Sequence, residues 1–247
     1  MKEHSGRIAL VSGGGSGIGR ATALALADAG ATVLVQDVSK QAVRSTVDLI
    51  EGKGGLAKPL AFDVRDEDSL KAATSEFPHI SLLIHCAGIA GSGLTTDQID
   101  RQKFDEMFSI HVWGAFNLVR AVSPGMREHR FGRIVNVASN RGQVGFERSC
   151  HYSAAKAALM NLGKSWAREF APDNILVNTI APGVVKTAMT EAHGLPAIKA
   201  EAQLNLLKRW AEPEEIAATA MFLFSEAGSY YTGQVLCPNG GDPIVGI

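Results

Sequence analysis

The fold is set near the amino terminus by one stretch of sequence, Arg7-Ile-Ala-Leu-Val-Ser-Gly-Gly-Gly-Ser-Gly-Ile-Gly19. Its apolar part, 7–12, has the length and composition of a buried strand and ends at consecutive glycines. The residues that follow, 17–29, have the composition of a helix. A strand, a glycine-rich turn and a helix in this order are typical of a site that binds a dinucleotide.

The glycines have different tasks in such a turn. Gly13 can adopt the positive φ of a tight turn, Gly17 lets the backbone approach a pyrophosphate, and Gly19 lets the helix pack on the strand. The amino terminus of the helix offers free N–H groups and a partial positive charge. We therefore predict that Gly13, Ser16, Gly17, Ile18 and Gly19 hold the phosphates of a dinucleotide. The alternative is a glycine-rich turn without a ligand.

Asp37 bears on which dinucleotide is bound. It ends the apolar run 31–36, eighteen residues after Gly19, where a carboxylate can bond both hydroxyls of an adenine ribose. A 2′-phosphate there would be repelled by roughly several kcal/mol at an effective dielectric of about 20, and neither Ser16 nor Val38 is a compensating cation. The sequence thus favours NAD over NADP, although an aspartate here could instead cap the next helix.

Strand and helix signals alternate along the whole chain, which indicates an α/β fold with a parallel sheet covered by helices on both faces. The expected strands are 7–12, 31–36, 56–62, 81–86, 133–138, 174–180 and 233–237, and the expected helices are 17–29, 39–51, 66–77, 101–129, 152–171 and 213–226. No linker or repeat divides the chain, so a single domain over 1–247 is predicted. The irregular stretch 183–212 is predicted to be a substrate-binding lid.

Composition and charge exclude several classes of partner. The net charge of −1 leaves no electrostatic footprint for nucleic acid or an anionic membrane. Cys86, Cys150 and Cys237 are few and far apart, which favours reduced thiols in a cytoplasmic protein. No run of eighteen apolar residues occurs, and the amino terminus has no apolar leader-like segment. We expect a cytoplasmic protein that acts on a small molecule.

Three further residues suit chemistry on an alcohol. A hydride leaves an alcohol carbon only as a base removes the hydroxyl proton. Tyr152 and Lys156 share a helix face, and an ammonium group ~4 Å from a phenol offsets about 4 kcal/mol of the cost of ionising it near neutral pH. The positive nicotinamide of an oxidised cofactor adds to this effect. Ser139 follows the strand 133–138 and could donate to the substrate oxygen.

These motifs together resemble the short-chain dehydrogenase/reductase family. The matching segments are 12–19, Asp63-Val64, Ala87-Gly88, Ser139, Tyr152-Ser-Ala-Ala-Lys156, Asn178-x-x-Ala-Pro-Gly183, Thr187 and Asn239-Gly-Gly241. The resemblance implies a Rossmann fold with a doubly wound, seven-stranded sheet. It also implies a homo-oligomer, a tetramer or dimer, in which the helices near 101–129 and 152–171 pair across subunits.

The resemblance also implies roles for residues that spacing alone does not assign. It places Tyr152 and Lys156 against the cofactor, with Lys156 on the nicotinamide ribose. Val185 and Thr187 would contact the carboxamide. The remaining cofactor contacts that it implies are Asp63 and Val64 in the adenine pocket, together with Cys86, Ala87, Gly88, Pro182 and Gly183.

Two segments depart from the family pattern. The usual Asn-Asn-Ala-Gly reads His85-Cys-Ala-Gly88 here, which puts in doubt a side-chain bond that braces the central strands. The usual Val-Asn-Leu-x-Gly reads Ile110-His-Val-Trp-Gly114, so His111 replaces an asparagine associated with a water relay behind the lysine. His111 should point inward, in phase with Phe104, Phe108, Ala115, Leu118 and Val122. It could hold the relay water through a ring nitrogen or be a core histidine with no catalytic part, and both readings stay open.

The residues around the expected substrate pocket are less informative. Arg141 and Arg148 could receive an anionic substrate or be solvated loop cations, and His151 and His193 could face the substrate. No pair of histidines has metal-ligand spacing, so no metal is expected.

The sequence therefore predicts an NAD(H)-dependent oxidoreductase that acts on a secondary alcohol or ketone, with Tyr152 as general acid/base. A 3-oxoacyl thioester reductase is the alternative among enzymes. A catalytically weak NAD-binding sensor or assembly protein is the alternative from another class.

Overall fold

The computed structural model describes residues 2–77, 79–91, 93–191 and 194–244, and the strands of these residues form one parallel sheet. The sheet order is β3-β2-β1-β4-β5-β6-β7, which confirms the predicted seven-stranded, doubly wound architecture. The strands are β1 (Ile8–Ser12), β2 (Thr32–Asp37), β3 (Leu56–Ala61), β4 (Ile80–His85), β5 (Gly132–Val137), β6 (Ile175–Ile180) and β7 (Val235–Leu236). The direction of winding reverses between β1 and β4, the place where open α/β sheets bind ligands.

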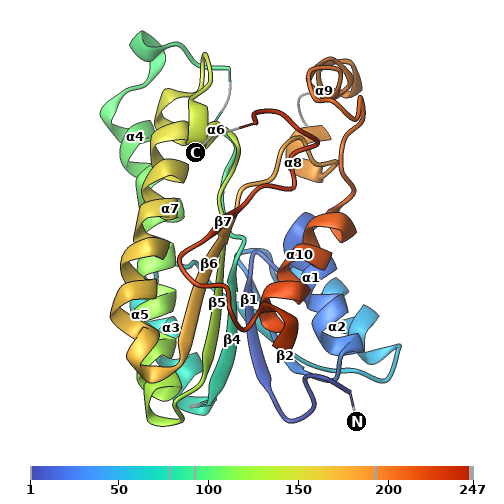
Figure 1. The fold of residues 1–247 in the computed structure, drawn as a ribbon, viewed down its shortest axis with the longest axis vertical. Coiled ribbons are helices and arrows are strands. Elements are labelled where there is room, and N and C mark those ends of the chain that lie inside the picture. Colours follow the sequence, from blue (N-terminus) through green and yellow to red (C-terminus); the bar gives the residue numbers. More distant parts are fainter. Residues whose placement is uncertain (1, 78, 92, 192–193, 245–247) are drawn as a thin grey trace.

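Helices cover both faces of the sheet (Figure 1). One layer consists of α1 (Gly17–Asp28), α2 (Lys40–Glu51) and α10 (Pro213–Phe224), and the other of α3 (Glu67–Glu76), α4 (Arg101–Phe108), α5 (Gly114–Glu128) and α7 (Cys150–Phe170). Because side chains alternate along a strand, Ala9 and Val11 join the core beneath the first layer, whereas Leu10 joins the core beneath the second. Strands buried on both faces account for the continuous apolar runs in the sequence.

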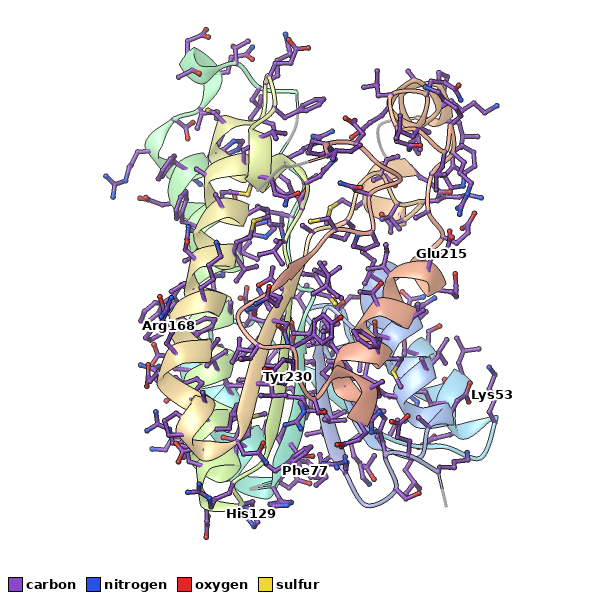
Figure 2. The ribbon with its side chains drawn as sticks, in the orientation of Figure 1. Lys53, Phe77, His129, Arg168, Glu215 and Tyr230 are labelled. Carbon is purple, nitrogen blue, oxygen red and sulfur yellow. The ribbon has the colours of Figure 1, made fainter. Side chains whose placement is uncertain are left out.

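The carboxyl ends of the strands meet at one edge of the sheet. In Figure 1 this is the upper edge, where α6 (Arg141–Val144), α8 (Ala188–Glu191) and α9 (Leu195–Ala202) lie. Phe77 and His129, labelled in Figure 2, mark the opposite edge, where β4 and β5 begin. No helix in the described residues combines the length and apolar character that a membrane crossing requires.

The stretch 183–212 is more regular than expected, because it contains α8 and α9. The segment follows β6 and leads into α10, and its two ends meet at one neck, where Val185 and Ala211 form an isolated parallel bridge. Beyond the neck, Arg209 donates to the Glu215 carboxylate at 2.7 Å and so ties the segment to the start of α10. Figure 2 labels Glu215 at the upper end of that helix.

The helix predicted over 101–129 is divided. A π-helical turn, η2 (Ser109–Trp113), separates α4 from α5. The smaller 3₁₀ turns η1 (Thr96–Gln98), η3 (Ala171–Asp173) and η4 (Glu226–Gly228) fall between the larger elements. The π turn carries His111 and therefore bears directly on the site.

Candidate active site

One cleft opens at the carboxyl edge of the sheet, beside the point where the winding reverses. Every residue that the sequence singled out for catalysis or cofactor binding lines it. These residues are Gly13, Ser16, Gly17, Ile18, Gly19, Asp37, Asp63, Val64, Cys86, Ala87, Gly88, His111, Ser139, Tyr152, Lys156, Pro182, Gly183, Val185 and Thr187. The structure thus brings the set together, whereas the role of each residue stays a prediction.

The glycine turn has the backbone that its sequence requires. Gly13 and Gly17 have φ angles of +64° and +49°, which glycine adopts without strain. A Cβ at Gly19 would lie 2.2 Å from the carbonyl oxygen of Gly13, so only glycine allows α1 to start this close to the turn. Ser16 is the N-cap of α1, its side chain makes no capping bond, and the first turn holds no acid. The N–H groups of this turn therefore suit an anion.

Asp37 is held toward the glycine turn. One carboxylate oxygen accepts from the Gly15 N–H and the other from the Ser39 N–H, both at 3.1 Å. The capping role considered for Asp37 belongs instead to Ser39, whose hydroxyl accepts from the Ala42 N–H at the start of α2. Asp37 is therefore placed at the cleft wall without being the cap of a helix.

Ser139, Tyr152 and Lys156 line the cleft together. Tyr152 and Lys156 lie on α7, and Ser139 follows β5. The Lys156 ammonium donates to the Val137 carbonyl at 2.8 Å and lies 5.6 Å from the centre of the Tyr152 ring. A Cβ at Gly142 would lie 2.8 Å from the Ala157 nitrogen, so this glycine lets the loop after β5 pack against α7.

Burial dominates the titration of both groups on α7. Burial raises the pKa of Tyr152, whereas the neighbouring Ser139 hydroxyl and the positive Arg141 lower it and the negative Glu201 raises it. Burial lowers the pKa of Lys156 to about 8. The role predicted for Lys156, a cation that favours the Tyr152 phenolate, stays a prediction. Arg141 is a second cation that lowers the pKa of Tyr152, and the Lys156 ammonium is fixed near the ring by its bond to the Val137 carbonyl.

His111 points inward from the π turn, as predicted, and is almost wholly buried. Its Nε2 lies 3.1 Å from the Ile89 nitrogen and 3.0 Å from the Ile89 oxygen, and its ring is perpendicular to the Tyr152 ring, with 5.5 Å between the ring centres. The other ring nitrogen, Nδ1, has no hydrogen-bond partner among the described residues. Burial holds the pKa of His111 well below its usual range, so the ring is neutral.

Gly88 makes room for this histidine. A Cβ at Gly88 would lie 2.3 Å from Cε1 of the His111 ring. The small residue after β4 and the large one in the π turn are therefore a matched pair.

His85 makes a side-chain bond between the central strands, although the departure from the family pattern at this position had put such a bond in doubt. Its Nδ1 lies 2.9 Å from the Ser12 hydroxyl on β1, and its Nε2 lies 3.3 Å from the His111 carbonyl. Burial lowers the pKa of His85 to about 3, so the ring is neutral. A neutral ring that accepts from Ser12 and donates to His111 links the glycine turn, β4 and the π turn. Beside it, burial raises the pKa of the Cys86 thiol to about 12, which makes it unreactive.

A second cleft adjoins the first and shares Ser139 and Tyr152 with it. Arg141 and Glu201 both line this second cleft and form an ion pair of 2.9 Å. Sequence reasoning missed Glu201, whose only signal is a charge between the inward-facing Ile198 and Ala202 of α9. Ile89 was missed too, because its contribution is a backbone contact.

Two of the other residues considered for the substrate pocket lie outside both clefts. Arg148 lines neither cleft and donates to the Gly93 carbonyl at 2.7 Å. His151 is buried next to Tyr152 but lines neither cleft, and His193 lies outside the described residues. Within the described part of the chain, no three His, Cys, Asp or Glu side chains group as a metal site would require.

The chain is similar to known proteins over almost its whole length. A family model described as enoyl-(acyl carrier protein) reductase matches residues 13–242. The chain is 38% identical over 242 residues to the 3-oxoacyl-(acyl-carrier-protein) reductase FabG of Thermotoga maritima, which covers 96% of this chain and 97% of that protein.

Solved structures give the same picture. A 3-oxoacyl-(acyl-carrier-protein) reductase from Brucella melitensis with bound NAD superposes with a TM-score of 0.90 at 34% identity, covering 97% of this chain and 92% of that one. A candidate NAD(P)-dependent gluconate 5-dehydrogenase from Beutenbergia cavernae, with NADP bound at low occupancy, has a TM-score of 0.90 at 33% identity and covers 96% of each chain.

Proposed function

This chain belongs to the short-chain dehydrogenase/reductase family, and from that premise we propose that it transfers a hydride between NAD and a secondary alcohol or ketone. The observation that carries the proposal is that Ser139, Tyr152 and Lys156 line the same cleft as the glycine turn. The N–H groups at the start of α1 suit the pyrophosphate, and Asp37 suits the adenine ribose.

In this proposal each protein group has a separate task. NAD, when bound, supplies the hydride acceptor and a positive ring. Tyr152 takes the hydroxyl proton of an alcohol, or returns it to a ketone. Ser139 now donates to the Asn140 side chain at 3.2 Å and accepts from the Arg141 N–H at 3.2 Å. Turning its proton toward the substrate oxygen would stabilise the charge that develops there. Lys156, with its pKa at about 8, is charged at neutral pH.

We propose NAD as the preferred cofactor because of charge at the ribose end. One similar structure contains NAD and another contains NADP, so similarity to known proteins does not decide which dinucleotide this chain prefers. Asp37 presents a carboxylate that would repel a 2′-phosphate. The neighbouring Arg20 is committed elsewhere, since it donates to the Thr46 hydroxyl and the Gly15 carbonyl.

Reduction of a 3-oxoacyl thioester is the second candidate function, and the name of the Thermotoga maritima relative favours it. A sensor or assembly protein with weak catalysis is the third, and the His85 and His111 departures motivate it. The close approach of Ser139, Tyr152 and Lys156 argues against a purely non-catalytic protein.

We further propose that the chain works as a homo-oligomer, a dimer or tetramer, in the cytoplasm. Trp113 and Phe116 at the start of α5 support the first part, because their rings stack at 5.4 Å between centres and both side chains are substantially exposed. Light scattering in solution tests this, and a monomeric mass at micromolar concentration would refute it.

The test of the function is the absorbance of reduced nicotinamide with NAD or NADP and a panel of secondary alcohols, sugars and 3-hydroxyacyl thioesters. We expect turnover with NAD, and a fall in kcat/KM of about a hundredfold or more in Tyr152→Phe. NAD binding should persist in that variant. Exclusive turnover of thioesters would support the second candidate. Silence across the panel despite NAD binding would support the third, and full activity of Tyr152→Phe would refute the mechanism.

A further inference from the structure

Arg141 occupies an unusual place for a cation. It begins α6, two residues after Ser139, and its side chain is only 17% exposed. Its guanidinium lies over the Phe146 ring, 4.1 Å from the centre. An arginine remains charged under all ordinary conditions, so a cation this enclosed needs an anionic partner.

Glu201 is that partner in the structure. Its Oε1 accepts from Nη2 of Arg141 at 2.9 Å, and its side chain is 32% exposed. Glu201 belongs to α9, which is held by the buried side chains of Ile198 and Ala202. In Figure 1, α9 and α6 come from separate parts of the chain and lie at the same upper edge of the molecule.

The pair does not exhaust the hydrogen-bonding capacity of Arg141. Among the described residues, its side-chain bonds run from Nη2 alone, so Glu201 uses one donor, and a carboxylate that replaces Glu201 could bind Nε or Nη1 as well. The planar fork of a guanidinium matches a carboxylate in particular. Arg141 also lines the cleft that contains Ser139 and Tyr152, so a group bound to it would be close to the reacting carbon.

We propose that Arg141 binds a carboxylate of the substrate in place of the Glu201 carboxylate, so that the substrates are hydroxy acids and their keto acids. This inference rests on the proposed function, because it concerns the same cleft. Exchange of one carboxylate for another keeps Arg141 paired. The released Glu201 is exposed enough to be hydrated, so its release costs less than that of a fully buried charge. A neutral substrate offers no comparable exchange.

Arg148 provides a matched control. It lies in the same connection between β5 and α7, carries the same charge and donates to the Gly93 carbonyl. Since it lines neither cleft, its removal should not affect a preference for acids.

Binding can be measured without turnover, because oxidised NAD and a ketone do not react with each other. The probes are straight-chain keto acids of four to six carbons, each compared with its own amide. Calorimetric titration into protein saturated with NAD should show at least one acid that binds roughly tenfold or more tightly than its amide. Arg141→Met should abolish that preference, Arg148→Met should retain it, and Glu201→Gln should increase it by removing the competing carboxylate.

Several results would overturn the inference. They are equal binding of every acid and its amide, failure of all the acids to bind, or loss of the acid preference in Glu201→Gln. NAD binding to each variant, measured first, shows that the variant is folded. Absence of NAD binding by the unmodified protein would refute the proposed function itself. Normal NAD binding without an acid preference would refute only the assignment of Arg141.

Discussion

The reacting side chains could be identified from sequence because their relationship is local. Tyr152 and Lys156 are one helical turn apart, and Ser139 is the residue two positions beyond the end of a recognisable strand. Their titration could not be predicted in this way. The pKa of Tyr152 depends on burial, then on Ser139 and Arg141, and also on Glu201, which comes from α9, far away in sequence. The spacing of residues on a helix determines which side chains lie close together, but not the burial and charges that set their pKa values.

The buried lysine leads to a prediction about stability. Its folded-state pKa of about 8 lies below the ordinary value of 10.5. Between these two pH values the unfolded chain retains a proton that the folded protein has lost, so raising the pH stabilises the fold. We expect the free energy of unfolding of the wild type to rise over pH 8–10.5, relative to Lys156→Met, by about 3 kcal/mol at most.

Denaturant titrations at several pH values measure this difference. Lys164→Met is the control, since it removes an exposed lysine from the same helix. Its pH profile should follow that of the wild type. Parallel profiles for the wild type and Lys156→Met would contradict the prediction.

At the scale of elements, the π turn shows where sequence periodicity fails. His111 does point inward with Ala115, Leu118 and Val122, but Phe104, placed on the same face by its spacing, is 41% exposed. Met107 is buried in its place. A π turn has an extra residue, which rotates the following helix relative to the preceding one. The apolar pattern on each side looks regular, so the change of phase between α4 and α5 leaves no clear mark in the sequence.

The same turn allows the two readings of His111 to be separated. The Ile89 N–H is 3.1 Å from the ring, and an asparagine could accept that bond whereas an alanine could not. We expect His111→Asn to retain most of the turnover. We expect His111→Ala to lower kcat by up to about a hundredfold, because the wall beside Tyr152 is displaced.

Steady-state kinetics of both variants with NAD measure this, together with the KM for NAD. Unchanged rates in both variants would remove His111 from the mechanism. An equal loss in both would show that the imidazole itself is required.

The whole molecule was the most predictable level, because its architecture follows from repeated signals. Seven apolar runs alternate with amphipathic segments, and a parallel sheet covered on both faces is the arrangement that buries them all. The least predictable part was 183–212. Its residues Leu204, Leu206 and Leu207 are largely exposed, so hydrophobic pattern says little about how α8 and α9 are placed. Glu201 lies in this part, which is why its place in the second cleft escaped prediction.

Cofactor binding should be visible in the stability of the whole molecule. A ligand at a hundred times its Kd adds about 2.7 kcal/mol to the free energy of unfolding. For a chain of this length that corresponds to a rise in Tm of roughly 5–10 °C. We expect NAD to produce this rise at a concentration at which NADP does not.

Thermal unfolding with each dinucleotide in turn measures the difference. In Asp37→Ala the rises in Tm produced by NAD and by NADP should become more similar, because the carboxylate that repels a 2′-phosphate is absent. An equal rise with NAD and NADP in the unmodified protein would contradict the assignment of Asp37.

The neck of the segment 183–212 has a consequence for the order of events. Two backbone hydrogen bonds of 2.9 Å hold the two ends of the segment together. The Ala211 N–H donates to the Val184 carbonyl, and the Lys186 N–H donates to the Ala211 carbonyl. Val185 lies between these two bonds and lines the same cleft as the glycine turn, whereas Glu201 lies farther along the segment, in α9. If α9 moved away from Arg141 with these two bonds intact, Val185 would keep its place in the cleft. In the proposed function the alcohol could then exchange while the dinucleotide stays bound.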